Sequence, residues 1–283
     1  MEKNNAIKIE LTKKSKIDTD GITKLFQIRA KVDIKNKFGL IQKGTIGGWV
    51  ESLKLKNGNA RVYGNAWVYD NAMVYDNARV SGNTIVSGNA RVYDNAMVYG
   101  NARVYGNAWV SGNARVYDNA RVSGNTIVSG NARVYDNAWV FGNARVSGTA
   151  WVYDNAMVYG NAWVYDNAMV YGNAWVYDNA WVYDNARVSG TAWVHDNARV
   201  YGNARVSGDA WVYGNARVYG NARVFGNARV YGNVWVSGNA WVYGNTKVSG
   251  RINLKISCNF EISRITIDTK KKLQKLKSFL DNF

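Results

Sequence analysis

The sequence predicts an all-β protein, a β-solenoid in which short parallel strands stack coil upon coil. Three observations predict this fold class. Thirty-two consecutive hexapeptides run without insertion from Asn59 to Gly250, the fourth position is valine in all of them, and the sixth is glycine or aspartate throughout. A repeat this regular is the architecture of the chain, and its many β-branched and aromatic residues argue against disorder.

Each hexapeptide follows the frame N-A-x-V-x-[GD], with alanine at the second position in twenty-eight cases. The alternation in A-x-V-x places Ala and Val on one face of a strand and the two variable residues on the other. The Gly-Asn or Asp-Asn pair that follows is typical of turns, because these residues tolerate positive φ. We therefore expect one four-residue strand and one corner per hexapeptide, with the valines inside and the strands stacked about 4.8 Å apart.

An aliphatic residue at every sixth position, with a small residue two before it, resembles the hexapeptide-repeat proteins of the single-stranded left-handed parallel β-helix type. The resemblance implies a triangular coil of three hexapeptides and the left hand, the exception to the usual crossover rule. Thirty-two hexapeptides would then make almost eleven coils. The junction "IQKGTIGGWVES" (Ile41–Ser52), followed by "NGNARVYGNAWVYD", is similar to the start of the repeats in YdcK-like proteins of bacteria and phages, some of which are labelled acyltransferases.

We expect three parts along the chain. Residues 1–58 form a strand-rich N-terminal cap, residues 59–250 form the repeats, and residues 251–283 form a fading last coil and an amphipathic capping helix. The helix would have Thr269 or Asp268 as N-cap and an apolar side made of Leu273, Leu276, Phe279, Leu280 and Phe283. A second interpretation, a helix that binds a membrane surface or a partner, rests on Lys270, Lys271, Lys272, Lys275 and Lys277.

The net charge of +16 lies mainly in the flanks, because the repeats hold 15 Lys and Arg against 11 Asp. Basic ends of this kind bind nucleic acid or acidic lipid, or are simply solvated. Cys258 is the only cysteine, which excludes a disulfide framework and a cysteine-based metal site. The first residues contain no apolar signal region and no stretch approaches eighteen apolar residues. We therefore expect no transmembrane segment and a cytoplasmic location.

The outward third and fifth positions hold the candidate binding residues. Arginine occupies the third position fourteen times and tryptophan eleven, and tyrosine occupies the fifth nineteen times. Residues eighteen apart would share a face, which predicts a ladder of Tyr99, Tyr117, Tyr135, Tyr153 and Tyr171 with Arg115 and Arg133 beside it. Such arrays suit an extended glycan or polyanion by stacking and charge. They equally suit a second copy in a homo-oligomer or filament, or serve the sheet alone through cross-strand contacts.

His195, the only histidine, is a weak candidate for the catalytic base that the resemblance to acyltransferases implies. It stands where other repeats have Tyr, Ser or Phe, and no loop interrupts a coil to build a pocket around a substrate. Corner aspartates such as Asp70, Asp76 and Asp94 fit turns better than calcium sites, so we expect no metal and no cofactor. The leading hypothesis is a non-catalytic scaffold or binding rod; the alternative is an acyltransferase-like enzyme, active or decayed.

The repeats also contain copies of themselves. The segment "NARVSGNTIVSGNARVYDNA" occurs at residues 77–96 and again at 119–138, forty-two residues later. Forty-two is seven hexapeptides but not a whole number of eighteen-residue coils, so the second copy should face another side of the triangle. A function that relies on general surface character would survive such copying.

Overall fold

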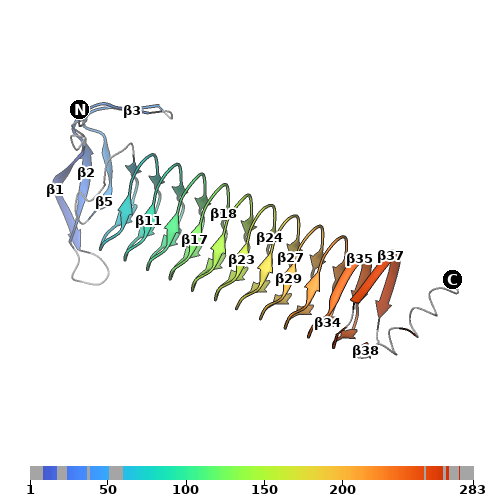
Figure 1. Cartoon of the computed structure of the whole chain (residues 1–283). Helices are drawn as coiled ribbons and strands as arrows, with labels where there is room; N and C mark the ends of the chain where they lie inside the picture. The colour runs from blue at the N-terminus through green and yellow to red at the C-terminus, as the bar shows by residue number, and fades with distance from the viewer. Residues whose placement is uncertain are drawn as a thin grey trace, which may run out of the picture. The chain divides into compact units, whose positions relative to one another are not determined.

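The computed structural model describes residues 9–17, 24–36, 39–50, 60–251, 253–263, 266–267 and 274. The chain divides into two compact units, Met1–Asn137 (unit 1) and Ala138–Phe283 (unit 2), and the boundary falls inside the repeats. Parallel β-strands dominate both units (Figure 1). The helix expected at the C-terminus lies almost wholly outside the described residues. Within the described part of the chain, no helix has the length and apolar character needed to span a membrane.

In unit 1 the repeat strands stack in three columns. Column A contains β5 (Ile46–Val50), β7 (Trp67–Val68), β10 (Ile85–Val86), β13 (Arg103–Val104) and β16 (Arg121–Val122). Column B contains β6 (Arg61–Val62), β9 (Arg79–Val80), β12 (Met97–Val98), β15 (Arg115–Val116) and β18 (Arg133–Val134). Column C contains β8 (Met73–Val74), β11 (Arg91–Val92), β14 (Trp109–Val110) and β17 (Ile127–Val128).

Unit 2 has three columns of its own. Column D contains β19 (Trp139–Val140), β22 (Met157–Val158), β25 (Trp175–Val176), β28 (Trp193–Val194), β31 (Trp211–Val212), β34 (Arg229–Val230), β36 (Lys247–Val248) and β38 (Thr266–Ile267). Column E contains β20 (Arg145–Val146), β23 (Trp163–Val164), β26 (Trp181–Val182), β29 (Arg199–Val200) and β32 (Arg217–Val218). Column F contains β21 (Trp151–Val152), β24 (Met169–Val170), β27 (Arg187–Val188), β30 (Arg205–Val206) and β33 (Arg223–Val224). The long strands β35 (Trp235–Tyr243) and β37 (Asn253–Ser263) end columns E and F together.

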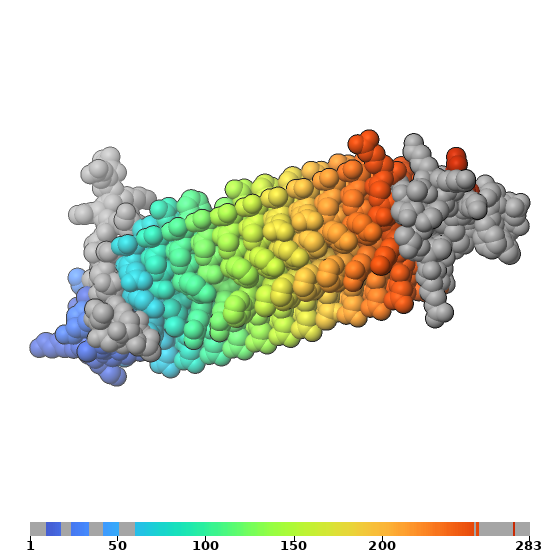
Figure 2. Space-filling model, turned by 90° about the horizontal axis from the view of Figure 1, so that it is seen from below, coloured from blue at the N-terminus to red at the C-terminus, as the bar shows by residue number. Residues whose placement is uncertain are grey.

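Within each unit the repeat strands pair with residues eighteen positions further on, except in the last two repeats, where the offset is 19 or 20. Arg61 is opposite Arg79, and Trp67 is opposite Ile85, in parallel register. One coil therefore contains three hexapeptides, as the family resemblance implied. Except for β35, the repeat strands are two residues long rather than four, because the fifth position already leads into the corner while its N–H still bonds to the next coil. In Figure 2 the outer side chains of unit 2 form successive bands from yellow to orange.

Valine fills the interior. All thirty-two fourth-position valines are buried, with Val68 the most exposed at 4%. The second-position alanines from Ala66 onward are buried beside them, and Thr84 and Thr126 take two of those positions with no exposed surface. Burial of a valine contributes roughly 1.5 kcal/mol or more, so a narrow core repeated many times stabilises the coil. The prediction that valines line the inside is confirmed.

The corners depend on the sixth position. All ten sixth-position aspartates have positive φ, for example 58° at Asp94. Several of these carboxylates bond to the next coil: Asp70 Oδ2 accepts the N–H of Gly88 at 2.9 Å, and Asp94 Oδ2 accepts that of Gly112 at 2.9 Å. This bond satisfies a backbone donor that the strand ladder leaves out, and it helps to offset the cost of the left-handed conformation. These aspartates have a turn role.

The first-position asparagines form ladders of their own. The side-chain amide of Asn83 donates to Asn101 at 3.2 Å, and Asn101 donates to Asn119 at 3.1 Å. In unit 2, Asn143 donates to Asn161 at 3.0 Å and Asn161 to Asn179 at 3.1 Å. An amide has both a donor and an acceptor, so it can repeat this bond at every coil.

Additional strands flank the coils at each end. In unit 1, β1 (Ile9–Ile17) pairs antiparallel with β2 (Lys24–Ala30), and β2 pairs antiparallel with β5, which continues column A. Strands β3 (Ile34–Asn36) and β4 (Gly39–Ile41) form a separate hairpin. In unit 2, β37 keeps the eighteen-residue register at its start and loses it between Gly238 and Ala240 of β35. The antiparallel addition covers an edge that would otherwise recruit other chains.

Candidate functional site

The predicted binding tyrosines form stacks within each unit. In column B the ring centroids of Tyr99 and Tyr117, and of Tyr117 and Tyr135, are 4.8 Å apart with planes within 3° of parallel. In column F, Tyr153 and Tyr171 are 4.9 Å apart. Each inner ring is covered on both faces by its neighbours and presents its edge outward. Stacking a sugar or a base along the column needs an exposed ring face, so the tyrosine stacks stabilise the coils rather than forming a stacking platform.

The two predicted arginines lie beside the column B stack. Arg115 is opposite Arg133 in β15 and β18, and Arg115 is exposed. Burial raises the pKa of Tyr99 above its usual value, while the charges of Arg115 and Arg133 oppose that rise. The guanidinium groups are therefore within electrostatic reach of the phenol. The tyrosine hydroxyl stays protonated near neutral pH and can donate a hydrogen bond.

Other arginines lie over tryptophan rings. The guanidinium carbon of Arg223 lies 4.8 Å from the ring centroid of Trp241, and that of Arg229 lies 4.8 Å from that of Trp211. Such cation–π contacts contribute about 0.5–1 kcal/mol at exposed sites. A guanidinium over a ring keeps its N–H edges available to carboxylate, sulfate or phosphate oxygens. The outer faces are therefore better suited to anionic groups than to rings.

Column F contains a row of three arginines, Arg187, Arg205 and Arg223, in register on consecutive coils. Arg187 and Arg205 are exposed and Arg223 is half-buried. Successive strands are about 4.8 Å apart. In the described part of the chain no ion pair joins these three to a carboxylate. We did not name this row from the sequence, although its eighteen-residue spacing was visible there.

The aspartates nearest in sequence to Arg187 and Arg205 already accept hydrogen bonds. Asp184 Oδ2 accepts the N–H of Gly202 at 3.0 Å. The carboxylate of Asp209 accepts the hydroxyl of Thr191. These bonds hold the two carboxylates at the corners, and within the described residues neither carboxylate forms an ion pair with the arginine row.

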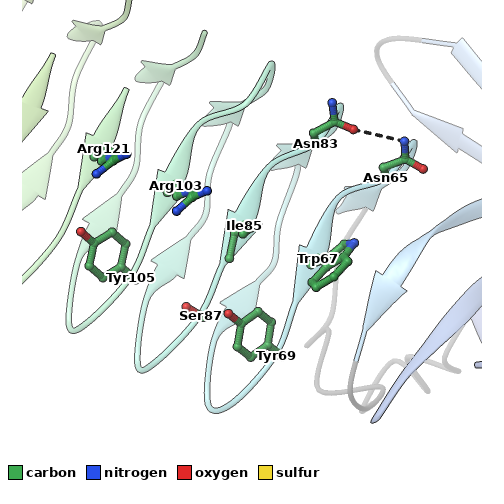
Figure 3. A pocket seen from close by; sticks show the side chains of 9 residues that line it. All are labelled: Asn65, Trp67, Tyr69, Asn83, Ile85, Ser87, Arg103, Tyr105 and Arg121. Atoms are coloured by element: carbon green, nitrogen blue, oxygen red, sulfur yellow. Dashed lines mark hydrogen bonds between the residues drawn. The ribbon is translucent and has the colours of Figure 1, made fainter. Parts of the chain in front are cut away.

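A groove of about 640 Å³ lies over column A of unit 1 (Figure 3). Its floor holds Ile85 and Ser87, where the neighbouring coils carry Trp67 and Tyr69 on one side and Arg103 and Tyr105 on the other. The groove therefore exists because Ile85 and Ser87 are shorter than the outward residues of the coils on either side. Tyr69 and Tyr105 are two strand spacings apart, about 9.6 Å, which leaves one rung missing from the ring column.

Lys16 approaches the same column from the cap. Its Nζ lies 3.9 Å from the ring centroid of Trp67 and 4.3 Å from that of Trp49. The groove thus has a tryptophan under a lysine at one end, while Arg103 lies towards the other. A smaller cavity of about 360 Å³ lies between the cap and the first coil, lined by Ile28, Ile46 and other residues. Both cavities belong to unit 1.

His195 lines neither cavity. Its imidazole takes a rung of the column D ring stack, 4.8 Å from Tyr177 and 5.1 Å from Tyr213, and its side chain is 15% exposed. Its Nδ1 lies 3.4 Å from Oδ1 of Asp196, and Asp178 belongs to the same cluster. A general base must reach a bound substrate, and here the ring is held between two phenols.

Comparison with known proteins identifies the repeats. The family model described as the YdcK beta solenoid repeat matches fourteen segments of the chain, which together cover more than half of it. These are residues 66–82, 72–88, 90–103, 96–112, 114–130, 128–141, 150–165, 162–178, 180–196, 198–214, 210–224, 216–230, 222–238 and 228–244. No curated protein matches the chain.

Proposed function

We propose that this chain, which belongs to the YdcK β-solenoid repeat family, is a non-catalytic scaffold whose arginine rows bind an extended polyanion. The observation that carries the proposal is the row of Arg187, Arg205 and Arg223 on consecutive coils. Three cations about one strand spacing apart repel one another. A polymer with closely repeated sulfate, phosphate or carboxylate groups would relieve that repulsion and gain charge-assisted hydrogen bonds.

Two features favour charge over ring stacking as the mode of binding. The inner rings of the tyrosine stacks have both faces covered, as with Tyr117 between Tyr99 and Tyr135. The arginines over tryptophans keep their N–H edges available. A neutral glycan would find few open ring faces here, so the proposal commits to an anionic polymer.

The acyltransferase alternative has less support. His195 is held between Tyr177 and Tyr213 and lines neither cavity. The repeats run from residue 59 to residue 250 without an inserted loop to enclose a substrate. A catalytic role would require this ring to leave its stack.

The proposal also includes the handedness of the coil and a helix at the C-terminus. We take the coil to be left-handed, since three hexapeptides per coil is the geometry of the left-handed β-helix that the sequence resembles. We also propose that the C-terminal segment with Leu273, Leu276 and Phe279 forms a capping helix. An experimental density map would test both, and a right-handed coil or an extended C-terminus would refute them.

The polyanion proposal is tested with purified full-length protein and labelled polymers. Binding to a sulfated polysaccharide, polyphosphate, single-stranded DNA and neutral dextran is measured over a range of salt. The row variant changes Arg187, Arg205 and Arg223 to Gln. The control variant changes Arg91, Arg145 and Arg229 to Gln, which removes the same charge from arginines that each contact one tryptophan.

We expect the row variant to lose at least tenfold in affinity at low salt. The slope of log K against log salt should flatten by up to about 3, one for each lost cation. The control variant should lose far less affinity than the row variant. Equal losses in both variants, equal binding to dextran, or no binding would refute the proposal. Acetyl transfer from acetyl-CoA that is abolished by His195→Ala would favour the enzyme instead.

A further inference from the structure

Three side chains with metal-binding atoms meet at one corner of unit 2. Asp178 follows β25, and His195 and Asp196 follow β28 on the next coil of column D. One ligand atom from each residue lies within 4.8 Å of the other two. Asp178 is exposed, whereas His195 and Asp196 are half-buried. The cluster joins two consecutive coils and remains open to solvent on one side.

The spacing of the pair His195 and Asp196 fits two ligands of one ion. Nδ1 of His195 lies 3.4 Å from Oδ1 of Asp196, which is longer than a good hydrogen bond. Two ligand atoms about 2.1 Å from a tetrahedral metal are roughly 3.4 Å apart. The other carboxylate oxygen of Asp196 accepts the N–H of Gly214 at 3.0 Å. That bond fixes the carboxylate with Oδ1 towards the imidazole.

The imidazole is held in place before any ligand arrives. It stacks on Tyr177 with planes 9° apart and on Tyr213 with planes 4° apart. It also meets the edge of Trp211, with centroids 6.5 Å apart. A side chain fixed in this way loses little freedom on binding, which favours affinity.

Histidine makes this corner different from otherwise similar ones. Asp166 and Asp184 are also eighteen residues apart, but the residue before the second aspartate is Tyr183. A phenol near neutral pH is a poor ligand, whereas a neutral imidazole is the commonest nitrogen ligand in proteins. The substitution of histidine for tyrosine thus adds a nitrogen donor to a pair of carboxylates.

We propose that Asp178, His195 and Asp196 form a binding site for a divalent transition-metal ion, Zn²⁺ being the best match. One imidazole and two carboxylates, with water in the fourth position, form a ligand set that zinc accepts. Nε2 of His195 is buried, and in the described residues it has no hydrogen-bond partner. Such a partner normally improves affinity 10–100-fold, so we expect micromolar rather than tighter binding.

The test uses tag-free, full-length protein with Cys258→Ser, because a cysteine thiolate also binds zinc. Calorimetry counts the Zn²⁺ equivalents, and absorption of bound Co²⁺ reports the ligand geometry. NMR of the imidazole is unambiguous because the chain has one histidine. We expect one equivalent of Zn²⁺, a shift of the His195 ring signals, and a higher melting temperature in the presence of zinc.

Two variants remove ligands without disturbing the repeat. His195→Tyr restores the common fifth-position residue, and Asp178→Asn keeps a residue that tolerates positive φ. Each should weaken Zn²⁺ binding at least tenfold. The matched control Asp166→Asn should leave it unchanged. The proposal is overturned if the Cys258→Ser protein fails to bind micromolar Zn²⁺, if His195→Tyr binds equally well, or if the ring signals do not move; His195 then serves as a ring-stack member only.

Discussion

Ser87→Tyr should complete the ring column of the groove. Ser87 stands between Tyr69 and Tyr105 on consecutive coils of column A. Elsewhere the fifth-position rings of adjacent coils stack 4.8–5.1 Å apart and nearly parallel. A tyrosine at this position would contact a ring on each side, and the groove would lose its floor space.

The expected gain follows from the two new ring pairs. Each aromatic pair contributes about 0.5–1.5 kcal/mol beyond the area that it buries, so two pairs give about 1–3 kcal/mol. Ordering the new side chain costs a fraction of this, which leaves a net gain of about 1–2 kcal/mol. Ser111→Tyr is the matched control, because Ser111 has Tyr93 on one side and Ser129 on the other. It should gain about half as much.

Native-state hydrogen exchange is the suitable assay, since repeat arrays do not unfold as a single two-state unit. A gain of 1–2 kcal/mol should slow exchange in the coils around residue 87 by about 5–30-fold. The reasoning is refuted if protection is unchanged or lower while the circular dichroism spectrum is retained. It is also refuted if Ser111→Tyr gains as much as Ser87→Tyr.

Three further predictions concern stability. Asp94→Ala should destabilise the protein by about 1–2 kcal/mol, and by more than Asp94→Gly does. Both variants lose the bond to Gly112, but only alanine keeps the cost of positive φ. Chemical denaturation shows which variant is less stable, and equal losses of stability would contradict the prediction. Thr84→Val should stabilise by about 1 kcal/mol, since the buried Thr84 hydroxyl has no partner among the described residues; unchanged exchange at its coil would count against this. The pKa of Tyr165 and Tyr177 is raised to about 12 in the folded chain, so the unfolded chain, with tyrosine pKa near 10, deprotonates first. Stability should be complete below pH 10 and decrease as the pH rises from 10 to 12, less so in the double Tyr→Phe variant, and a flat profile in that window would show the prediction to be wrong.

The interior of the coil could be predicted almost completely from the sequence. The alternation around the valine at every sixth residue assigns one face of each short strand to the interior, and the burial of Val68, Val74 and every later repeat valine confirms that face assignment. Positive φ at the sixth position followed from the chemistry of Gly and Asp. These features depend on residue type and period, which a single chain displays.

The outer faces were harder to predict because they depend on side-chain orientation between coils. We identified the tyrosine ladder but left open whether its rings bind a polymer, bind a second copy or contact only one another, and the structure shows inner rings such as Tyr117 covered by their neighbours. The groove arises from the neighbours that Ile85 and Ser87 acquire eighteen residues away. Writing the chain in rows of eighteen would have revealed the gap. It would not have revealed the 3.4 Å approach of His195 to Asp196.

Because the register is eighteen residues and the repeat is six, gain or loss of one hexapeptide preserves the core but changes which side chains share an outer face. Deleting or inserting one hexapeptide leaves a valine in every core position, because each unit of six carries its own corner and its own interior residues. All downstream residues then move to the next side of the coil. Such an insertion or deletion between Asp178 and His195 would separate these two side chains, whereas one before Asp178 would move both to another side of the coil together. Such a gene can gain or lose hexapeptides while the protein keeps its core and rearranges the side chains on its outer faces. Natural variants that differ in length by multiples of six codons would be evidence of that process.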